Sequence, residues 1–393
     1  MPELAKGMEN HVNNDVKAIR PSAIRDFDMK ISSIPGLVKL TLGEPDFNVP
    51  EHVKEAAVQG IRDNDSHYGP AAGKLELRKA VAKYLADTRN VDYNPEDEIL
   101  ITNGGTEALT AITFSLLNPG DKVLVPTPVF SLYFPIITLT GAECIQVDTS
   151  DDGFVLTPEK LQSEIDKHGD VKMILLNYPC NPTGRAYPED LLRRLGKILH
   201  DNNILIVADE MYSELTYDQE HFSLATIYPE QTLLVSGLSK SHAMTGWRLG
   251  YIAGPAPLIG EIYKMHGFMV TCVNDIAQDA AVEALNNGRE DPVAFRKEYQ
   301  KRRDFVVDRM EKMGFDIATP DGAFYVFAKI PAQFGKDDFN FALDLAKKAK
   351  VGVIPGSAFG AGGEGYIRIS YAASDEKLQK AMDQIKQYLD TLD

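Results

Sequence analysis

The chain has 393 residues, of which 44% are hydrophobic and 25% are charged, and its formal net charge is −16. This length predicts two domains, or three. The acidic balance argues against binding to nucleic acid or to an anionic membrane surface, because both would repel the protein. The sequence shows no run of about 18 uncharged apolar residues and no apolar signal-peptide core, so we expect neither a transmembrane helix nor a secretory leader.

Cysteine and histidine usage predicts no metal site. Cys144, Cys180 and Cys272 lie far apart and form no C-x-x-C pair, and the histidines are scattered without an H-E-x-x-H motif. A disulfide framework is equally unsupported. This pattern is typical of a protein in a reducing cytoplasm, and we expect a cytoplasmic location.

Helix-like and strand-like segments alternate through most of the chain. In chain order, we expect helices over residues 14–33, 51–64, 73–87 and 106–117. Short apolar segments, mostly rich in branched residues, predict strands over residues 38–42, 98–102, 122–125, 173–176, 204–208, 232–235 and 249–253. Strands buried on both faces with helices between them are typical of an α/β domain with a mostly parallel sheet.

The last quarter of the chain has a different order of elements. A long helix is predicted over residues 291–312, strands over 324–327, 351–354 and 367–371, and a closing helix over 376–392. This order indicates a smaller α+β unit. We therefore expect a large domain at residues 50–290, and a small domain made of residues 1–49 together with 291–393.

The most specific motif follows the predicted strand at 232–235 and reads Ser-Gly-Leu-Ser-Lys240-Ser-His-Ala-Met-Thr-Gly-Trp-Arg248. Open α/β sheets bind ligands at the carboxyl ends of their strands, which is where Lys240 falls. Arg248 could hold a phosphate with two parallel hydrogen bonds. A lysine and an arginine at this spacing, taken alone, also fit a surface loop; the full string is much more specific.

A carboxylate ends another predicted strand, in Ile-Leu-Ile-Val-Ala-Asp209-Glu210-Met-Tyr212. A buried aspartate needs a cationic partner or becomes protonated. A protonated pyridine nitrogen would serve, and Tyr212 could donate to a ring hydroxyl. The alternative is that Asp209 or Glu210 caps the next helix.

Further motifs lie at strand ends and in loops. In Asn177-Tyr-Pro-Cys-Asn181-Pro-Thr-Gly, the Asn181 amide could donate to a phenolate oxygen, although Asn-Pro turns are common. In Thr102-Asn-Gly-Gly105-Thr106, a glycine-rich turn opens a helix, whose N-terminus attracts anions; Thr106 could instead be a simple helix cap.

Two side chains are candidates for binding anionic groups. Tyr68 lies in a Gly/Pro loop and could reach a phosphate, or could belong to a surface turn. Arg368 lies in an apolar strand, where an unpaired guanidinium would be costly. A substrate carboxylate would pair with it, and so would a structural salt bridge. The stretch Gly360-Ala-Gly-Gly-Glu-Gly365 matches G-x-G-x-x-G, but a strand follows it rather than a helix, so we reject a nicotinamide site.

Together these motifs resemble the class I/II aminotransferases of the fold-type I pyridoxal 5′-phosphate (PLP) family, from Leu42-Gly-Glu-Pro-Asp-Phe47 to Arg368-Ile-Ser370. The resemblance implies that Lys240 is the Schiff-base lysine, that Asp209 pairs with the pyridinium nitrogen, and that Tyr212 and Asn181 hold the ring oxygen. It assigns the remaining cofactor and substrate contacts as follows: phosphate to Gly105, Thr106, Ser239 and Arg248; the partner subunit's phosphate to Tyr68; ring stacking to Phe130; substrate carboxylate to Gly43, Asn181 and Arg368.

The resemblance also implies a homodimer with shared active sites and a ping-pong transfer of an amino group to a 2-oxo acid such as 2-oxoglutarate. The Lys240 string is similar to aromatic, aspartate and N-acetyl-diaminopimelate aminotransferases, and no motif identifies the side-chain pocket. The alternatives are a PLP-dependent C–S lyase or decarboxylase on the same fold, or a PLP-sensing regulator. A regulator would need a DNA-binding segment, and residues 1–49 are short and not basic enough for one.

Overall fold

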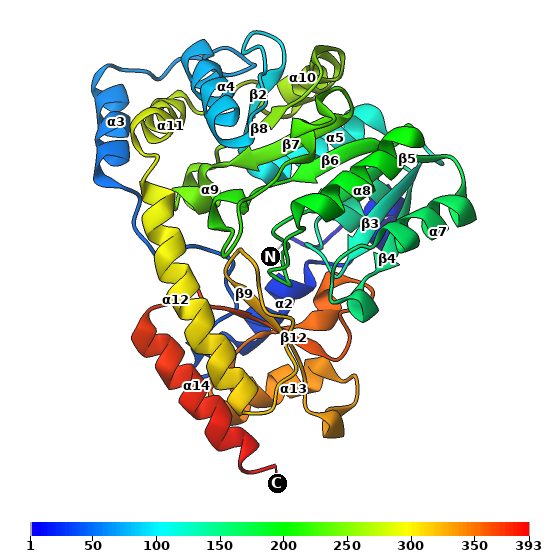
Figure 1. The fold of residues 1–393 in the computed structure, drawn as a ribbon, viewed down its shortest axis with the longest axis vertical. Coiled ribbons are helices and arrows are strands. Elements are labelled where there is room, and N and C mark those ends of the chain that lie inside the picture. Colours follow the sequence, from blue (N-terminus) through cyan, green and yellow to red (C-terminus); the bar gives the residue numbers. More distant parts are fainter. Residues whose placement is uncertain (1, 393) are drawn as a thin grey trace.

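A seven-stranded sheet forms the centre of the larger part of the molecule (Figure 1). The computed structural model describes residues 2–392. The strand order across the sheet is β2 (Ile99–Thr102), β8 (Gly250–Ala253), β7 (Thr232–Gly237), β6 (Leu205–Asp209), β5 (Val171–Asn177), β3 (Lys122–Thr127) and β4 (Glu143–Asp148). The pairs from β7 to β4 are parallel, whereas β8 runs antiparallel to both β2 and β7. The expected mostly parallel α/β sheet is therefore confirmed.

The apolar residues of these strands alternate between two cores. Leu233 and Val235 point to one face of the sheet and Leu234 to the other, as the period of two in a strand requires. One face is covered by α5 (Gly104–Leu116), α6 (Tyr133–Thr138) and α10 (Ala256–Val270). The other is covered by α3 (Glu51–Arg62), α4 (Leu75–Arg89), α7 (Pro158–His168), α8 (Glu189–Asp201) and α11 (Asp275–Asn287).

Strand β4 was not predicted from the sequence. β4 lies at the sheet edge, and its residues alternate between exposed and buried, so it lacks the continuous apolar run of the central strands. Charged and polar residues, Glu143, Gln146 and Asp148, occupy its exposed positions. Polar side chains on an edge strand discourage pairing with other chains. They also interrupt the apolar run by which a buried strand is recognised in a sequence.

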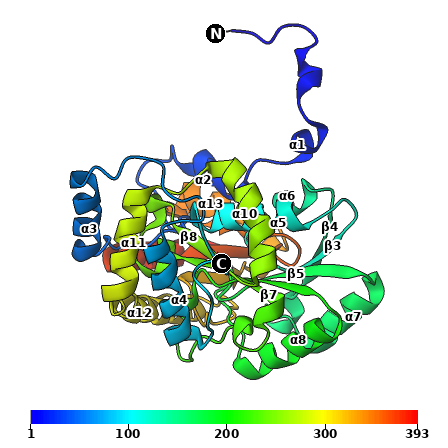
Figure 2. The same ribbon diagram turned by 90° about the horizontal axis from the view of Figure 1, so that it is seen from above.

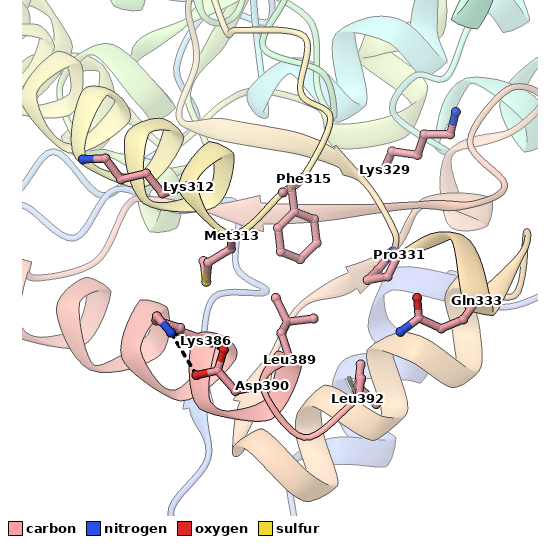
Figure 3. Close-up of a pocket in the computed structure, with 11 residues that line it drawn as sticks. Lys312, Met313, Phe315, Lys329, Pro331, Gln333, Lys386, Leu389, Asp390 and Leu392 are labelled. Carbon is pink, nitrogen blue, oxygen red and sulfur yellow. Dashed lines mark hydrogen bonds and ion pairs between the residues drawn. The ribbon is translucent and has the colours of Figure 1, made fainter.

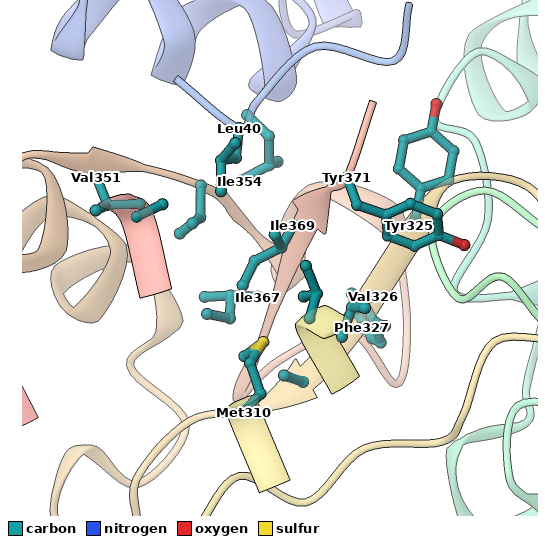
Figure 4. Packing of buried hydrophobic residues seen from close by; sticks show 14 of the residues in the cluster. Leu40, Met310, Tyr325, Val326, Phe327, Val351, Ile354, Ile367, Ile369 and Tyr371 are labelled. Atoms are coloured by element: carbon teal, nitrogen blue, oxygen red, sulfur yellow. The ribbon is translucent and has the colours of Figure 1, made fainter. Parts of the chain in front are cut away.

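A second, smaller layer of structure is built around β9 (Tyr325–Lys329), β12 (Tyr366–Ser370) and β11 (Ile354–Pro355), which form an antiparallel sheet. Its apolar side chains pack against α12 (Asp291–Lys312), α13 (Asp338–Asp344) and α14 (Asp375–Leu389) (Figure 4). β1 (Val38–Lys39) pairs with β10 (Val351–Gly352) beside this core. The strand expected over residues 351–354 is in fact two short strands that belong to different sheets.

The N-terminal segment differs from its prediction. The single helix expected over residues 14–33 is divided into α1 (Asn14–Ala18) and α2 (Ala23–Ile31). Pro21 lies between them, and a proline removes a backbone donor and disfavours helical geometry in the residue before it. Figure 2 shows the segment before α2 extending away from the rest of the chain.

The pairing of β1 with β10 joins the first residues of the chain to the last hundred. We propose on this basis that residues 1–49 and 291–393 form one small unit, and residues 50–290 a large unit. Within residues 2–392 no helix is long and apolar enough to cross a membrane. The same residues contain no cluster of three or more histidine, cysteine or acidic side chains that could hold a metal ion.

Candidate active site

Polar side chains gather where β2, β5, β6 and β7 end, at one edge of the large sheet. Asn177 ends β5 and is in register with Asp209, the last residue of β6. Because β8 is antiparallel, its first residue, Gly250, lies beside Gly237 at the same edge. The reversed strand therefore brings Arg248, two residues before β8, to the edge that Asp209 occupies.

Lys240 lies on the short helix α9 (Leu238–Ser241), which begins directly after β7. Its Nζ donates a hydrogen bond of 2.6 Å to the carbonyl oxygen of Gly43, in the small unit. Burial, with further contributions from Arg248 and Arg368, lowers the pKa of Lys240 to about 8, despite the opposing charge of Glu44. About a tenth of this amine is therefore neutral and nucleophilic at pH 7, far more than for an ordinary lysine.

Asp209 is buried at the end of β6, with 6% of its surface exposed. The Tyr133 hydroxyl donates to its Oδ2 at 2.5 Å, and the Met211 backbone N–H donates to its Oδ1 at 3.1 Å. Burial raises the pKa of Asp209 to about 6, since no lysine, arginine or histidine within residues 2–392 forms an ion pair with it. The carboxylate thus suits a cationic ligand that enters the cavity.

Glu210 has a separate role from its neighbour. Successive strand side chains point to opposite faces, and the Glu210 carboxylate accepts a hydrogen bond of 2.5 Å from Ser223 and lies 2.7 Å from the His221 ring. Arg89 completes this buried cluster at 3.4 Å. Glu210 is therefore a structural residue of this buried cluster. It does not cap the next helix, whose N-cap residue is Tyr212.

Arg368 is buried on β12, and no acidic side chain within residues 2–392 forms an ion pair with it. Its Nη1 donates to Asn181 Oδ1 at 2.8 Å and its Nη2 donates to the Thr41 carbonyl at 2.7 Å. Its Nε is buried and makes no hydrogen bond. A guanidinium with 2% of its surface exposed and no anion beside it is costly, so the position suits an anionic ligand.

The first turn of α5 forms an anion cradle with Arg248. The helix begins at Gly104, two residues earlier than predicted, so Gly105 and Thr106 are in its first turn and Thr106 is not the cap. Backbone N–H groups of a first helical turn have no partner within the helix. A Cβ added at Gly104 would lie 2.5 Å from an Arg248 guanidinium nitrogen, so the arginine packs directly on this turn. Ser239, buried on α9, lines the same cavity.

The aromatic wall of the cavity joins the two units. The Tyr212 and Tyr325 hydroxyls are 2.8 Å apart, from opposite units. Gly43 packs so closely on Tyr325 that a Cβ there would overlap the tyrosine hydroxyl. Phe130 lies edge-on to Tyr133, with ring centres 6.1 Å apart. Glycine at 43 is therefore required for the close approach that lets its carbonyl meet Lys240.

A cavity of about 310 Å³ contains most of the predicted site residues. They are Gly43, Gly105, Thr106, Phe130, Asn181, Asp209, Tyr212, Ser239, Lys240, Arg248 and Arg368. Tyr68 is the exception: its side chain is 89% exposed and does not line the cavity of its own chain. A role for Tyr68 therefore depends on a partner subunit.

Sequence reasoning missed several residues of the cavity. Tyr325 has no motif of its own, and neither has Tyr133, which does not line the cavity but holds Asp209. Thr41, Ile24 and Arg25 come from the N-terminal segment, whose helical pattern is weak. The signal that could have found Tyr325 is its place at the start of an apolar strand that pairs with the strand of Arg368. A separate hollow of about 260 Å³ between α12 and α14 holds Met313, Phe315 and Leu389 (Figure 3), and shares no residue with this cavity.

The comparisons with known proteins agree with the site. The family "Aminotransferase class I and II" matches residues 35–385. The chain is 41% identical, over 97% of its length and 96% of the relative's, to a probable N-acetyl-LL-diaminopimelate aminotransferase of Bacillus subtilis. It is 36% identical to an aspartate aminotransferase of Pyrococcus abyssi, over 94% of this chain and 96% of that relative.

Solved structures with a similar fold also include aminotransferases. The chain superposes on an aspartate aminotransferase of Thermus thermophilus, solved with maleate, with a TM-score of 0.90, 36% identity, and coverage of 96% of this chain and 99% of that one. A Pyrococcus protein named A1 gives a TM-score of 0.93 at 35% identity, covering 96% and 98%. The chain therefore belongs to the class I and II aminotransferases, and it is a transaminase with the fold-type I architecture.

The family implies PLP, and the residues present fit this cofactor. The cradle at Gly104 and Arg248 would receive a phosphate, and the half-buried Lys240 amine would bond to the aldehyde. Asp209, whose burial raises its pKa, would regain a full negative charge beside a pyridinium nitrogen. Each end of a flat phosphorylated pyridine thus has a complementary group in one cavity.

Proposed function

We propose that this aminotransferase moves the amino group of an L-amino acid to a 2-oxo acid such as 2-oxoglutarate by a ping-pong mechanism. The observation that carries the proposal is one cavity that contains an amine with a lowered pKa, a buried carboxylate and a buried guanidinium that forms no ion pair within residues 2–392. The amine and carboxylate suit the cofactor, and the guanidinium suits the α-carboxylate of the substrate.

In this proposal the bound PLP supplies an electron sink for the bond to the substrate Cα. Gly105, Thr106, Ser239 and Arg248 would hold the phosphate, and Phe130 would stack on the ring. Tyr212 and Asn181 bind the ring oxygen; Asn181 Oδ1 already accepts from Arg368, which leaves its N–H₂ group to donate. Asp209 keeps the ring nitrogen protonated, and Tyr133 orients Asp209.

Lys240 moves the proton in each half-reaction. With the cofactor bound, the Lys240 Nζ would serve as the base, in a cavity where burial and two arginines lower its pKa to about 8. Its hydrogen bond to the Gly43 carbonyl holds the amine at the boundary of the two units, where Arg368 would fix the substrate carboxylate. Substrate binding and proton transfer are thereby set in one geometry.

The proposed amino donors are an aromatic amino acid, an aspartate-type amino acid, or N-acetyl-diaminopimelate. The names of the similar proteins, which include aspartate, aromatic and N-acetyl-LL-diaminopimelate aminotransferases, support this range. We also propose a homodimer, in which the exposed Tyr68 reaches the phosphate of the other subunit's cofactor. This would explain an aromatic ring left 89% exposed in a Gly/Pro loop.

A donor panel tests the proposal. The purified protein, loaded with PLP, is incubated with 2-oxoglutarate and each amino acid in turn, and donor loss and glutamate formation are measured. Initial rates at several fixed acceptor concentrations should give parallel double-reciprocal lines, as ping-pong kinetics require. Pyruvate release from an amino acid without any acceptor would instead identify the C–S lyase alternative, and carbon dioxide release the decarboxylase.

A further inference from the structure

Glu107 places a carboxylate in the first turn of α5, the turn that also carries Gly105 and Thr106. In the ligand-free helix a negative charge at this place is favourable, because it offsets the partial positive charge of the helix N-terminus. For a bound phosphate the same charge is unfavourable, since like charges repel strongly where solvent is partly excluded. The phosphate cradle therefore needs a group that balances Glu107.

The two carboxylate oxygens of Glu107 have different partners. The residue is buried, with 7% of its surface exposed, and its Oε2 accepts a hydrogen bond of 2.9 Å from the Asn103 backbone N–H. Its Oε1 lies 3.2 Å from Nδ1 of His266, a completely buried residue of α10, which packs along α5 (Figure 2). Within residues 2–392 no lysine or arginine forms an ion pair with Glu107, so His266 is the group that can balance its charge.

The other ring nitrogen of His266 fixes the protonation of the pair. Nε2 lies 2.7 Å from the carbonyl oxygen of Ala71, in the loop that carries Tyr68. A carbonyl oxygen only accepts hydrogen bonds, so Nε2 holds a proton and donates it. Nδ1 faces a carboxylate oxygen, and a hydrogen bond between these two atoms needs a second proton, held by the imidazole or by the carboxyl group. In either arrangement the pair of Glu107 and His266 has no net charge.

We propose that His266 is a positioning residue of the cofactor site, which neutralises Glu107 and thereby allows the first turn of α5 to bind a phosphate that carries nearly two negative charges. Glu107 in turn holds the Asn103 backbone, where this turn begins. Neither side chain lines the catalytic cavity, so both act through the helix and not by contact with the cofactor. The proposal rests on the proposed PLP-dependent function and deepens it.

The test separates the charge of Glu107 from its shape. His266→Gln removes the balancing proton and leaves a buried carboxylate without a cationic partner, which is the costly way to break such a pair. The double variant Glu107→Gln/His266→Gln removes the charge as well, while the new amide oxygen still accepts from Asn103. Absorbance titration of the cofactor-free protein then measures Kd for PLP and for pyridoxal, which has the same ring and aldehyde but no phosphate.

We expect His266→Gln to weaken PLP binding about 10- to 100-fold, and pyridoxal binding by less than about threefold. Glu107→Gln and the double variant should both bind PLP within about threefold of the wild type, so that the second substitution rescues the first. His266→Asn, whose neutral amide can still donate to Glu107, should show the same phosphate-specific loss. The result therefore does not depend on the folding of one variant.

His52→Gln is the matched control. His52 also faces acidic side chains with both ring nitrogens, at 2.8 Å from Glu283 and 3.0 Å from Asp291, and it lies outside the cavity. It should bind both ligands within about threefold of the wild type. Equal losses of PLP and pyridoxal in His266→Gln, a double variant that binds PLP no better than His266→Gln, or an equal effect of His52→Gln would overturn the inference. A wild-type protein that binds neither ligand would instead refute the proposed function.

Discussion

The two walls of the catalytic cavity are built differently. On the large unit, side chains such as Asn177 and Asp209 end strands and are held by contacts within that unit: Asn177 Nδ2 donates to the Asp209 carbonyl at 3.1 Å, and the Tyr133 hydroxyl donates to Asp209. On the small unit, Arg368 is held by residues far away in sequence, Asn181 and Thr41. The difference suggests that the side chains of the large unit form a rigid cofactor wall. Those of the small unit form a substrate wall, which is assembled only when the two units meet.

The largest effect is expected from Lys240→Ala, on the cofactor wall. Turnover should fall more than about 10⁴-fold for every substrate, because both the cofactor bond and the proton carrier are lost. Borohydride treatment should attach PLP covalently to the wild type and to the control Lys197→Ala, an exposed lysine of α8, and mass spectrometry should find no adduct at position 240 in the variant. Retained covalent labelling in Lys240→Ala would contradict the assignment.

Asp209→Asn should come next, with a fall in turnover of about 10³-fold and PLP still bound. The neutral amide keeps the shape of the carboxylate but does not hold the ring nitrogen protonated, and one preorganised electrostatic contact is commonly worth about 10²–10³-fold. The decrease should be the same for all substrates, because this wall does not contact the side chain. Near-normal turnover would refute the electron-sink role.

The same variant tests the pKa of Asp209 in the cofactor-free protein. Burial raises this pKa from 3.8 to about 6, so the group favours the folded state fully below pH 3.8 and loses that contribution as the pH rises through 6. An asparagine does not titrate. Urea unfolding should therefore show the variant gaining about 1 kcal/mol in unfolding free energy relative to the wild type between pH 5 and 7.5. A pH-independent difference would show that Asp209 is already paired.

Arg368→Met should affect the substrate wall alone. We expect kcat/KM to fall about 10²-fold for every amino acid, because one bidentate contact to the carboxylate is lost, while the absorbance and affinity of bound PLP stay near those of the wild type. Arg193→Met, at an exposed position on α8, is the matched control. A loss of PLP affinity in Arg368→Met would show that the two walls are not separate.

The smallest expected effect is that of Tyr325→Phe, which removes one hydroxyl from the contact between the walls. The Tyr212 hydroxyl loses its partner at 2.8 Å, and a neutral hydrogen bond corresponds to about a three- to tenfold change. Steady-state kinetics with a good donor should show this change, and Tyr366→Phe, on the neighbouring strand, should show none. An effect above about 100-fold would mean that Tyr325 acts directly on the substrate.

The cofactor wall was predictable and the substrate wall was only partly so. Lys240, Asp209 and Asn181 each follow a short apolar run, so the sequence places them at a strand end, and parallel strands bring such ends together. Arg368 was found because a guanidinium in an apolar strand is unusual. The hydrogen-bond partners of Arg368 could not be predicted from the sequence, because they lie 187 and 327 residues away and depend on how the two units meet.

The N-terminal segment shows the limit most clearly. Its apolar residues are few and Pro21 interrupts the helix, so the pattern indicated neither the two helices nor their position over the cavity. The role of Tyr133 could not be predicted either, because only tertiary packing brings its hydroxyl to Asp209, 76 residues further along the chain. Side chains that position others carry less signal in a sequence than side chains that end a strand.

The burial of the Arg368 guanidinium, which forms no ion pair within residues 2–392, has a thermodynamic consequence. Its hydration shell is removed when the chain folds, and burial already lowers its pKa before any ligand is present. An arriving carboxylate therefore does not have to strip water from this arginine, and the whole interaction is available for affinity and orientation. The cost appears instead as lower stability of the ligand-free enzyme, which any small carboxylate that fits the cavity should relieve by mass action.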